Sequence, residues 1–82
     1  ARVAQPDELC EVRVPVQDRA GVLADVTTLA AELDVSIADL EIAHSSEGDA
    51  GVLILLVPSD RVERFQGGLL ARGYRPAVRT LE

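Results

Sequence analysis

The first regular pattern along the chain is an alternation of apolar and polar positions close to its beginning. The apolar positions are Cys10, Val12, Val14 and Val16. A two-residue period of this kind is typical of a β-strand that buries one face. Residues 17–21 interrupt the alternation and include Asp and Gly, which favour turns. We therefore expect a loop between this strand and the next element.

The apolar period then lengthens to that of an amphipathic helix over residues 22–33. Its predicted buried stripe consists of Val22, Val26, Leu29 and Leu33. A second strand is predicted over residues 35–44. The apolar phase shifts within this segment near Ala38 and Asp39, which indicates a bulge or a bend.

Two more strands are predicted in the second half of the chain. Residues 52–57 are all apolar, a pattern expected of a strand that is covered on both faces. Residues 74–80 are predicted to form the last strand. Pro76 lies within this segment and has no N–H to donate, so we place the strand at an edge of the sheet.

A second helix is expected between these strands, opening after residues 58–60 and ending at Gly73. Asp60 and Glu63 have the spacing of a capping box. The predicted buried face consists of Val62, Phe65, Leu69 and Leu70. Gly67 and Gly68 each cost roughly 1 kcal/mol relative to Ala in a helix, so this helix is either weak or packed closely against a neighbour.

The order of the predicted elements is βαββαβ, which defines an α+β fold. Because each β-α-β unit crosses over right-handed, we expect a ferredoxin-like sandwich with both helices on one face of a four-stranded antiparallel sheet in the order 4-1-3-2. A chain of 82 residues forms one domain. Residues 1–8 show no periodicity and are predicted to be a linker or disordered end, which leaves residues 9–82 as the domain.

Composition narrows the classes of function. The net charge is −6, all eight basic residues are Arg, and only two residues are aromatic, which argues against nucleic-acid binding. No apolar run approaches the roughly 20 residues of a membrane span. Cys10 is the single cysteine, so it forms no internal disulfide and has no partner at metal-ligand spacing. We expect Cys10 to be a small buried apolar residue in a reduced, cytoplasmic protein.

Proteins with ferredoxin-like folds have many different functions, so the function of this chain must be inferred from the residues of its site. A metallochaperone would need a Cys pair in the first loop, and an acylphosphatase would need an Asn, which this chain lacks. An RNA-recognition module would carry aromatic residues on its central strands. His44 is the only histidine and is interpreted as a polar residue at a strand end, without a nucleophile–base pair around it. No catalytic residues are expected.

Two segments resemble the ACT domain family. Residues 18–26, DRAGVLADV, are similar to the D-R-P-G-V-L-A-x-V signature of the family, and residues 35–42, VSIADLEI, resemble its second strand. The resemblance covers about residues 10–80, and within the family it is strongest to the C-terminal ACT domain of bacterial prephenate dehydrogenases. The chain departs from the pattern at three positions, where Ala20 replaces Pro, Asp34 replaces Gly and Ser36 replaces Asn.

The loop before the first helix also has the physical properties of a binding site. Gly21 has no Cβ, so a ligand can approach the backbone, and the amides and dipole at a helix start favour a carboxylate, here expected on Gly21 to Leu23. Asp18 or a carbonyl at the start of the second strand would meet an ammonium group. A glycine before a helix is, however, often only a turn residue. Arg13 and Arg19 could bind anions, although solvated surface charge is the simpler interpretation.

The resemblance implies that a ligand lies between two domains, touching this loop on one and the early second strand on the other. The expected ligand-binding residues are Asp18, Arg19, Ala20, Gly21, Val22, Leu23, Val35, Ser36 and Ile37. The implied function is that of a regulatory amino-acid-binding domain, the feedback module of a prephenate dehydrogenase-like enzyme of tyrosine biosynthesis. The implied ligand is tyrosine or phenylalanine.

The expected partners are the catalytic domain of the parent chain and a second copy, joined through the exposed edge of the second strand. The chain itself is expected to carry no cofactor, and NAD(P) is implied only for the parent enzyme. Two alternatives remain open at this point: a ligand-free ACT dimerisation module, and the regulatory domain of another enzyme of amino-acid metabolism. A small enzyme is disfavoured by the absence of a catalytic constellation.

Overall fold

The elements follow the predicted order along the chain. The computed structural model describes residues 9–17, 19–44 and 50–81. The elements are β1 (Leu9–Val16), α1 (Arg19–Glu32), β2 (Asp39–His44), β3 (Gly51–Pro58), α2 (Val62–Ala71) and β4 (Ala77–Thr80). The expectation that residues 1–8 form a linker lies outside the described residues. No helix in the described part of the chain is long and apolar enough to cross a membrane.

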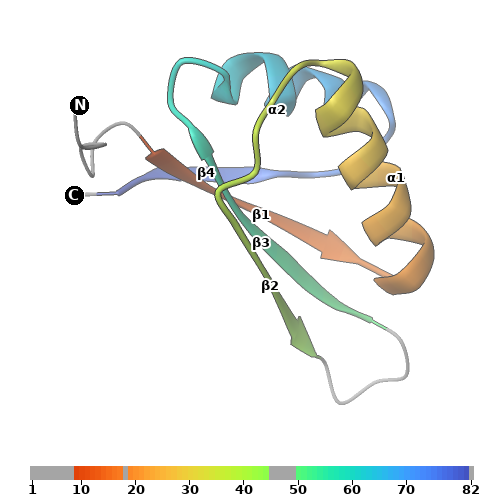
Figure 1. Ribbon diagram of the computed structural model, residues 1–82. Coiled ribbons are helices and arrows are strands. Elements are labelled where there is room, and N and C mark those ends of the chain that lie inside the picture. Colours follow the sequence, from red (N-terminus) through yellow and green to blue (C-terminus); the bar gives the residue numbers. More distant parts are fainter. Residues whose placement is uncertain (1–8, 18, 45–49, 82) are drawn as a thin grey trace.

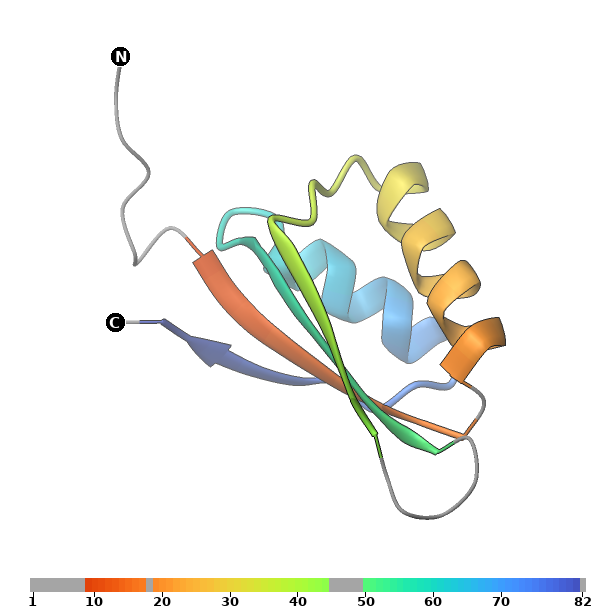
Figure 2. The same cartoon turned by 60° about the horizontal axis from the view of Figure 1, so that its bottom comes forward.

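The four strands form one antiparallel sheet in the order β2-β3-β1-β4, which is the predicted order 4-1-3-2 seen from the other edge. Both helices pack on the same face of this sheet (Figures 1 and 2). The prediction of a ferredoxin-like sandwich is therefore confirmed.

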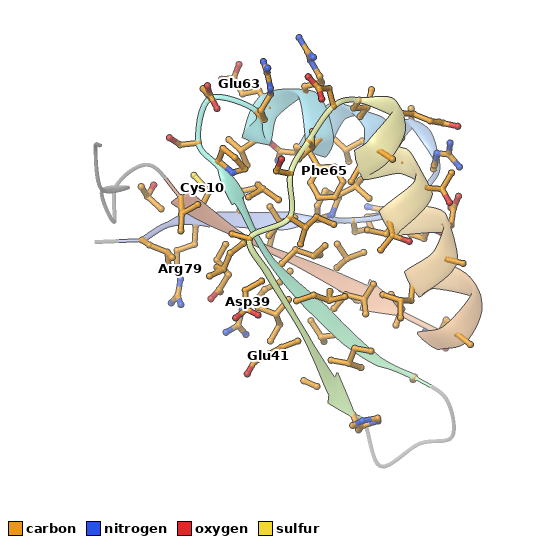
Figure 3. The ribbon with its side chains drawn as sticks, viewed as in Figure 1. Cys10, Asp39, Glu41, Glu63, Phe65 and Arg79 are labelled. Carbon is orange, nitrogen blue, oxygen red and sulfur yellow. The ribbon has the colours of Figure 1, made fainter. Side chains whose placement is uncertain are left out.

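The core lies between the helices and the facing side of the sheet. Alternate residues of the central strands point into it; Val12 of β1, for example, is paired with Leu55 of β3. The largest fully buried side chains are Phe65, Leu53, Leu55, Leu69, Val12, Val14, Val26 and Val57. Phe65 points from α2 towards the sheet (Figure 3). Cys10 is buried among them as the expected small hydrophobe.

The prediction that both faces of β3 are covered is wrong. Leu53, Leu55 and Val57 are buried beneath the helices, whereas the alternate residues of the strand are only half-buried. The reason is topological, since both helices lie on one face and the described residues place no second layer on the other. The continuous apolar run therefore correctly indicates that β3 is a central strand, but it does not indicate that both faces of the strand are buried.

The helix α1 begins at Arg19, three residues before the predicted start. Arg19, Ala20 and Gly21, which were expected in a loop, are therefore helical. The buried stripe is the predicted one, with Val26 and Leu29 in the core and Val22 and Leu33 packed against it. The helix ends at Glu32, where Asp34 adopts a left-handed conformation with a φ of 59°. Asp34 thus takes the conformation that the family pattern assigns to a glycine.

The strand β2 begins at Asp39 instead of residue 35. Val35 is buried and its N–H bonds to the carbonyl of Ala30 at 2.8 Å, so this segment closes the end of α1 before it joins the sheet. The chain bends at Ala38, as the shift of apolar phase predicted, and the Ala38 N–H donates to the carbonyl of Leu56 at 2.7 Å. Regular pairing begins only after this bend.

The start of α2 and the start of β4 also differ from the prediction, whereas the end of α2 agrees with it. The helix α2 starts after Arg61, and no side chain caps it, so the expected capping box of Asp60 and Glu63 is not formed. It ends as predicted before Gly73, whose φ of 91° favours glycine. The strand β4 has four residues and begins after Pro76, so this edge is short instead of being interrupted by the proline.

Candidate functional site

The first half of the candidate site is the junction between β1 and α1. Gly21 lies in the first turn of α1, where the backbone amides and the helix dipole favour an anion. Because the helix begins at Arg19, the N–H of Leu23 lies one turn inside it and bonds to the carbonyl four residues earlier. The part of α1 that a ligand can approach at this end is therefore its first turn, before Leu23. Asp18 lies outside the described residues.

The second half follows the other end of α1. Val35 is buried, Ile37 packs against the core, and the side chain of Ser36 is exposed to solvent. A helix of 14 residues is about 21 Å long, so these residues and Gly21 lie at opposite ends of α1. Figure 2 shows this separation. One copy of the chain does not bring the two groups of predicted residues together.

A groove of about 430 Å³ lies beside the first half of the site. Its lining residues are Pro15, Val16, Gln17, Val22, Gly73, Tyr74 and Arg75. Three of them are apolar side chains, and Gln17, Tyr74 and Arg75 supply polar atoms. Arg75 forms no hydrogen bond or ion pair with any described residue. The groove offers apolar surface and a positive charge but no nucleophile beside a base, an arrangement suited to binding.

Tyr74 is held in place by α1. Its hydroxyl donates a hydrogen bond to Asp25 Oδ2 at 2.6 Å, and the other oxygen of Asp25 forms an ion pair with Arg72. The hydrogen bond to Asp25 and partial burial raise the pKa of Tyr74 above its usual 10.0. The polar rim of the groove is therefore anchored to the helix that carries Gly21.

Sequence reasoning missed Tyr74 and Arg75. They stand about fifty residues after the loop and carry no motif that links them to it. Only the crossover of α2 into β4 brings them next to Val22. The signal available in the sequence was the predicted topology, which places the start of the fourth strand beside the end of the first.

A second cavity, of about 400 Å³, lies over β1 and β4 on the open side of the sheet and includes Glu11, Arg13 and Arg79. Glu11 accepts hydrogen bonds from Arg13 Nε at 2.7 Å and from Arg79 at 3.3 Å. These bonds, above all the one from Arg13, hold the pKa of Glu11 below its usual value despite its burial. The sequence favours solvated surface charge as the role of Arg13. In the structure, Arg13 forms an ion pair with Glu11.

The described residues contain no group of three or more His, Cys, Asp or Glu that could hold a metal ion. His44 lies at the end of β2 and is exposed, as a polar residue at a strand end.

The fold matches that of ACT domains in solved structures. The chain has the ferredoxin-like fold of ACT domains and superposes with a TM-score of 0.64 on an ACT domain protein from Streptococcus pneumoniae at 18% sequence identity, covering 88% of both chains. It also superposes on the regulatory subunit of aspartate kinase from Thermus flavus with a TM-score of 0.75 at 16% identity. That match covers 90% of this chain and about half, 52%, of the kinase subunit.

Sequence similarity accompanies the fold in one of these comparisons. The chain is 29% identical to the ACT domain of prephenate dehydrogenase from Bacillus anthracis, with a TM-score of 0.77. The match covers 82% of this chain and 99% of that domain. The resemblance seen in the sequence is thereby confirmed. No protein-family model matches the chain, and none of the curated proteins shows significant similarity to it.

Proposed function

We propose that this chain is a regulatory domain that binds an amino acid between two copies of itself. The observation that carries the proposal is the direction of the strands. β1 and β2 both run antiparallel to β3, so they run parallel to each other. The loop follows the end of β1, whereas residues 35–37 precede the start of β2. The two halves of the site therefore lie at opposite ends of the sheet.

Antiparallel pairing of β2 with β2 of a second copy reverses the partner. Residues 35–37 of the partner subunit then come to the end of the sheet where this chain carries its β1–α1 junction. Two equivalent sites form, each completed by the other copy, and the result is one continuous eight-stranded sheet. The β2 edge has six residues against four in β4, which favours it as the pairing edge.

In this arrangement the ligand carboxylate lies at the start of α1, where the helix dipole favours an anion, next to Gly21, whose missing Cβ leaves room for it. Ser36 of the partner subunit donates or accepts a hydrogen bond. Asp18 is proposed to meet the ammonium group. The groove beside Val22, with Tyr74 and Arg75 on its rim, receives the part of the ligand that extends away from α1.

The regulatory role follows from the shared site. A ligand held between two domains stabilises the paired arrangement and passes a coupling free energy, typically about 1 to 3 kcal/mol, to an attached catalytic domain. The similarity to the ACT domain of a prephenate dehydrogenase supports a parent enzyme of that kind, in tyrosine biosynthesis. Tyrosine or phenylalanine is accordingly the proposed ligand.

Calorimetric titration of the chain with tyrosine and phenylalanine tests ligand binding. We expect saturable binding with one ligand per chain. If none of the twenty amino acids binds while the chain is a dimer, the domain is a dimerisation module only.

Hydrogen exchange tests whether the two copies pair through the β2 edge. Amides of β2 should become protected as concentration rises through the dimerisation range, and protection of β4 instead would contradict the proposed pairing.

A further inference from the structure

The face of the sheet opposite the helices carries an ordered pattern of charge. Its residues form rows across the four strands, fixed by the strand register. One row consists of Asp39, Leu56, Glu11 and Arg79, and the next consists of Glu41, Ile54, Arg13 and Ala77. Figure 3 shows Asp39, Glu41 and Arg79 on the side of the sheet away from the helices. We call this surface the open face.

The two sides of the open face have opposite charge. On β2, Asp39 and Glu41 are exposed and have no cationic partner among the described residues. On β4, Arg79 reaches Glu11 with one nitrogen, yet its side chain remains 67% exposed. Arg13 lies beside it on β1. The acidic border and the basic border are separated by the β3 stripe.

The middle of the open face is apolar. Val52, Ile54 and Leu56 of β3 are half-buried and form a continuous stripe along the strand. Beside them on β1 lie Pro15 and the aliphatic stem of Arg13, while the charge of Glu11 is neutralised by two arginines. A partner that covers this face must offer apolar surface in its middle and the opposite charges at its borders.

The chain itself meets this description. We propose that the open face packs against the open face of a second copy, about a two-fold axis that runs along the strands in the plane between the two sheets. Such an axis places β2 of one copy over β4 of the other and keeps residues of one row opposite each other. Asp39 then faces Arg79 of the partner subunit, and Arg79 faces the partner's Asp39. The stripe of β3 lies over the partner's β1.

The charges select this axis. A two-fold axis across the strands would place β2 on β2 and bring Asp39 and Glu41 against their own copies, which is repulsive. This contact uses the face of the sheet and leaves the β2 edge available. It is therefore distinct from the proposed edge dimer. Because β2 of one copy lies over β4 of the other, the two contacts together would extend into an open array instead of closing a tetramer.

Charge exchange between two variants tests the proposal by sedimentation equilibrium. Asp39→Arg and Arg79→Asp each place like charges opposite each other in a homodimer, so each alone should associate through this face at least tenfold more weakly than the parent chain. Mixing the two variants restores both pairs of opposite charge. We expect the mixture to recover the association, and added salt to weaken it.

Glu63→Arg is the matched control, because it changes the net charge by the same amount on α2, away from the open face (Figure 3). It should associate like the parent chain. If Arg79→Asp does not fold, Arg79→Gln replaces it, because glutamine keeps a hydrogen-bond donor near Glu11. Mixed with Asp39→Arg, this variant still restores one of the two pairs of opposite charge, the one between its own Asp39 and the Arg79 of the other variant. Unchanged association of Asp39→Arg, or no gain on mixing, overturns the proposal. Loss of edge protection in hydrogen exchange would overturn only the edge dimer.

Discussion

Gly68 of α2 lies directly against Leu33 at the end of α1. A Cβ atom at Gly68 would stand 2.8 Å from Leu33 Cδ1 and 3.3 Å from both Cδ atoms of Leu29. Gly67, its neighbour, has nothing within 4 Å of the same position. Of the two interpretations left open by the sequence, close packing therefore applies to Gly68, and a local weakness of the helix applies to Gly67.

This difference gives a matched pair of substitutions. Gly67→Ala should raise the free energy of unfolding by about 0.5 to 1 kcal/mol, because it restores helix propensity without a steric cost. Gly68→Ala should give a smaller gain or none, because the ends of the Leu33 and Leu29 side chains must first move aside. Urea denaturation followed by circular dichroism measures both. Equal effects of the two substitutions would contradict the close contact.

Tyr74 is the only tyrosine, so its ionisation can be followed by ultraviolet absorbance alone. We expect its pKa to lie above 10.0 and to fall towards that value in Asp25→Ala, because the hydrogen bond to Asp25 and the nearby carboxylate favour the neutral phenol. Because the folded pKa is raised, the bond stabilises the protein below about pH 10 and this contribution is lost as pH rises through the folded pKa.

Tyr74→Phe tests the same bond through stability. It should lower the free energy of unfolding by about 1 kcal/mol at pH 7, the usual contribution of one hydrogen bond at a half-buried position. The difference from the parent chain should shrink above pH 10. A difference that is independent of pH would show that the ring packs without the bond to Asp25.

Glu11 makes stability depend on pH in the acid range. Its folded pKa is lowered by Arg13 and Arg79, so its ionised form stabilises the protein above the unfolded pKa of about 4.5. This contribution is lost as pH falls through the folded pKa. Between pH 7 and pH 3, the parent chain should lose more stability than Glu11→Gln does. Glu63→Gln, an exposed control on α2, should follow the parent chain.

Gly21→Val tests the ligand site. A side chain at this position should abolish binding of tyrosine or phenylalanine in calorimetry, because it obstructs the approach to the first-turn amides. Gly21 lies within α1, where any residue can adopt the helical backbone, so the free energy of unfolding should change by less than about 1 kcal/mol. Ala31→Val, an exposed change near the other end of the same helix, should bind like the parent chain.

Ser36→Ala extends this test to the second half of the site. Loss of one neutral hydrogen bond, about 0.5 to 1.5 kcal/mol, should weaken binding roughly two- to tenfold. Tight binding by Gly21→Val in its folded state would show that the ligand does not lie against the first turn of α1.

The sequence alone determined the order of elements, the topology and most of the core. Periodicity is a local property, so the stripe of Val22, Val26, Leu29 and Leu33 could be identified before the structure. The right-handed crossover rule then fixed the sheet order. The phase shift at Ala38 was also visible locally, although not the delay of β2 until Asp39.

Only the tertiary structure decided which surfaces are covered and which distant residues meet. The apolar run of β3 predicted two covered faces, yet burial depends on where the helices pack, and both lie on one side. Tyr74 and Arg75 reach the groove beside Val22 because α2 returns the chain to that end of the sheet. The separation of Gly21 from Ser36 by the length of α1 is likewise a property of the folded chain. Local patterns specify elements, whereas a site made from two ends of a helix depends on how those elements are arranged in space.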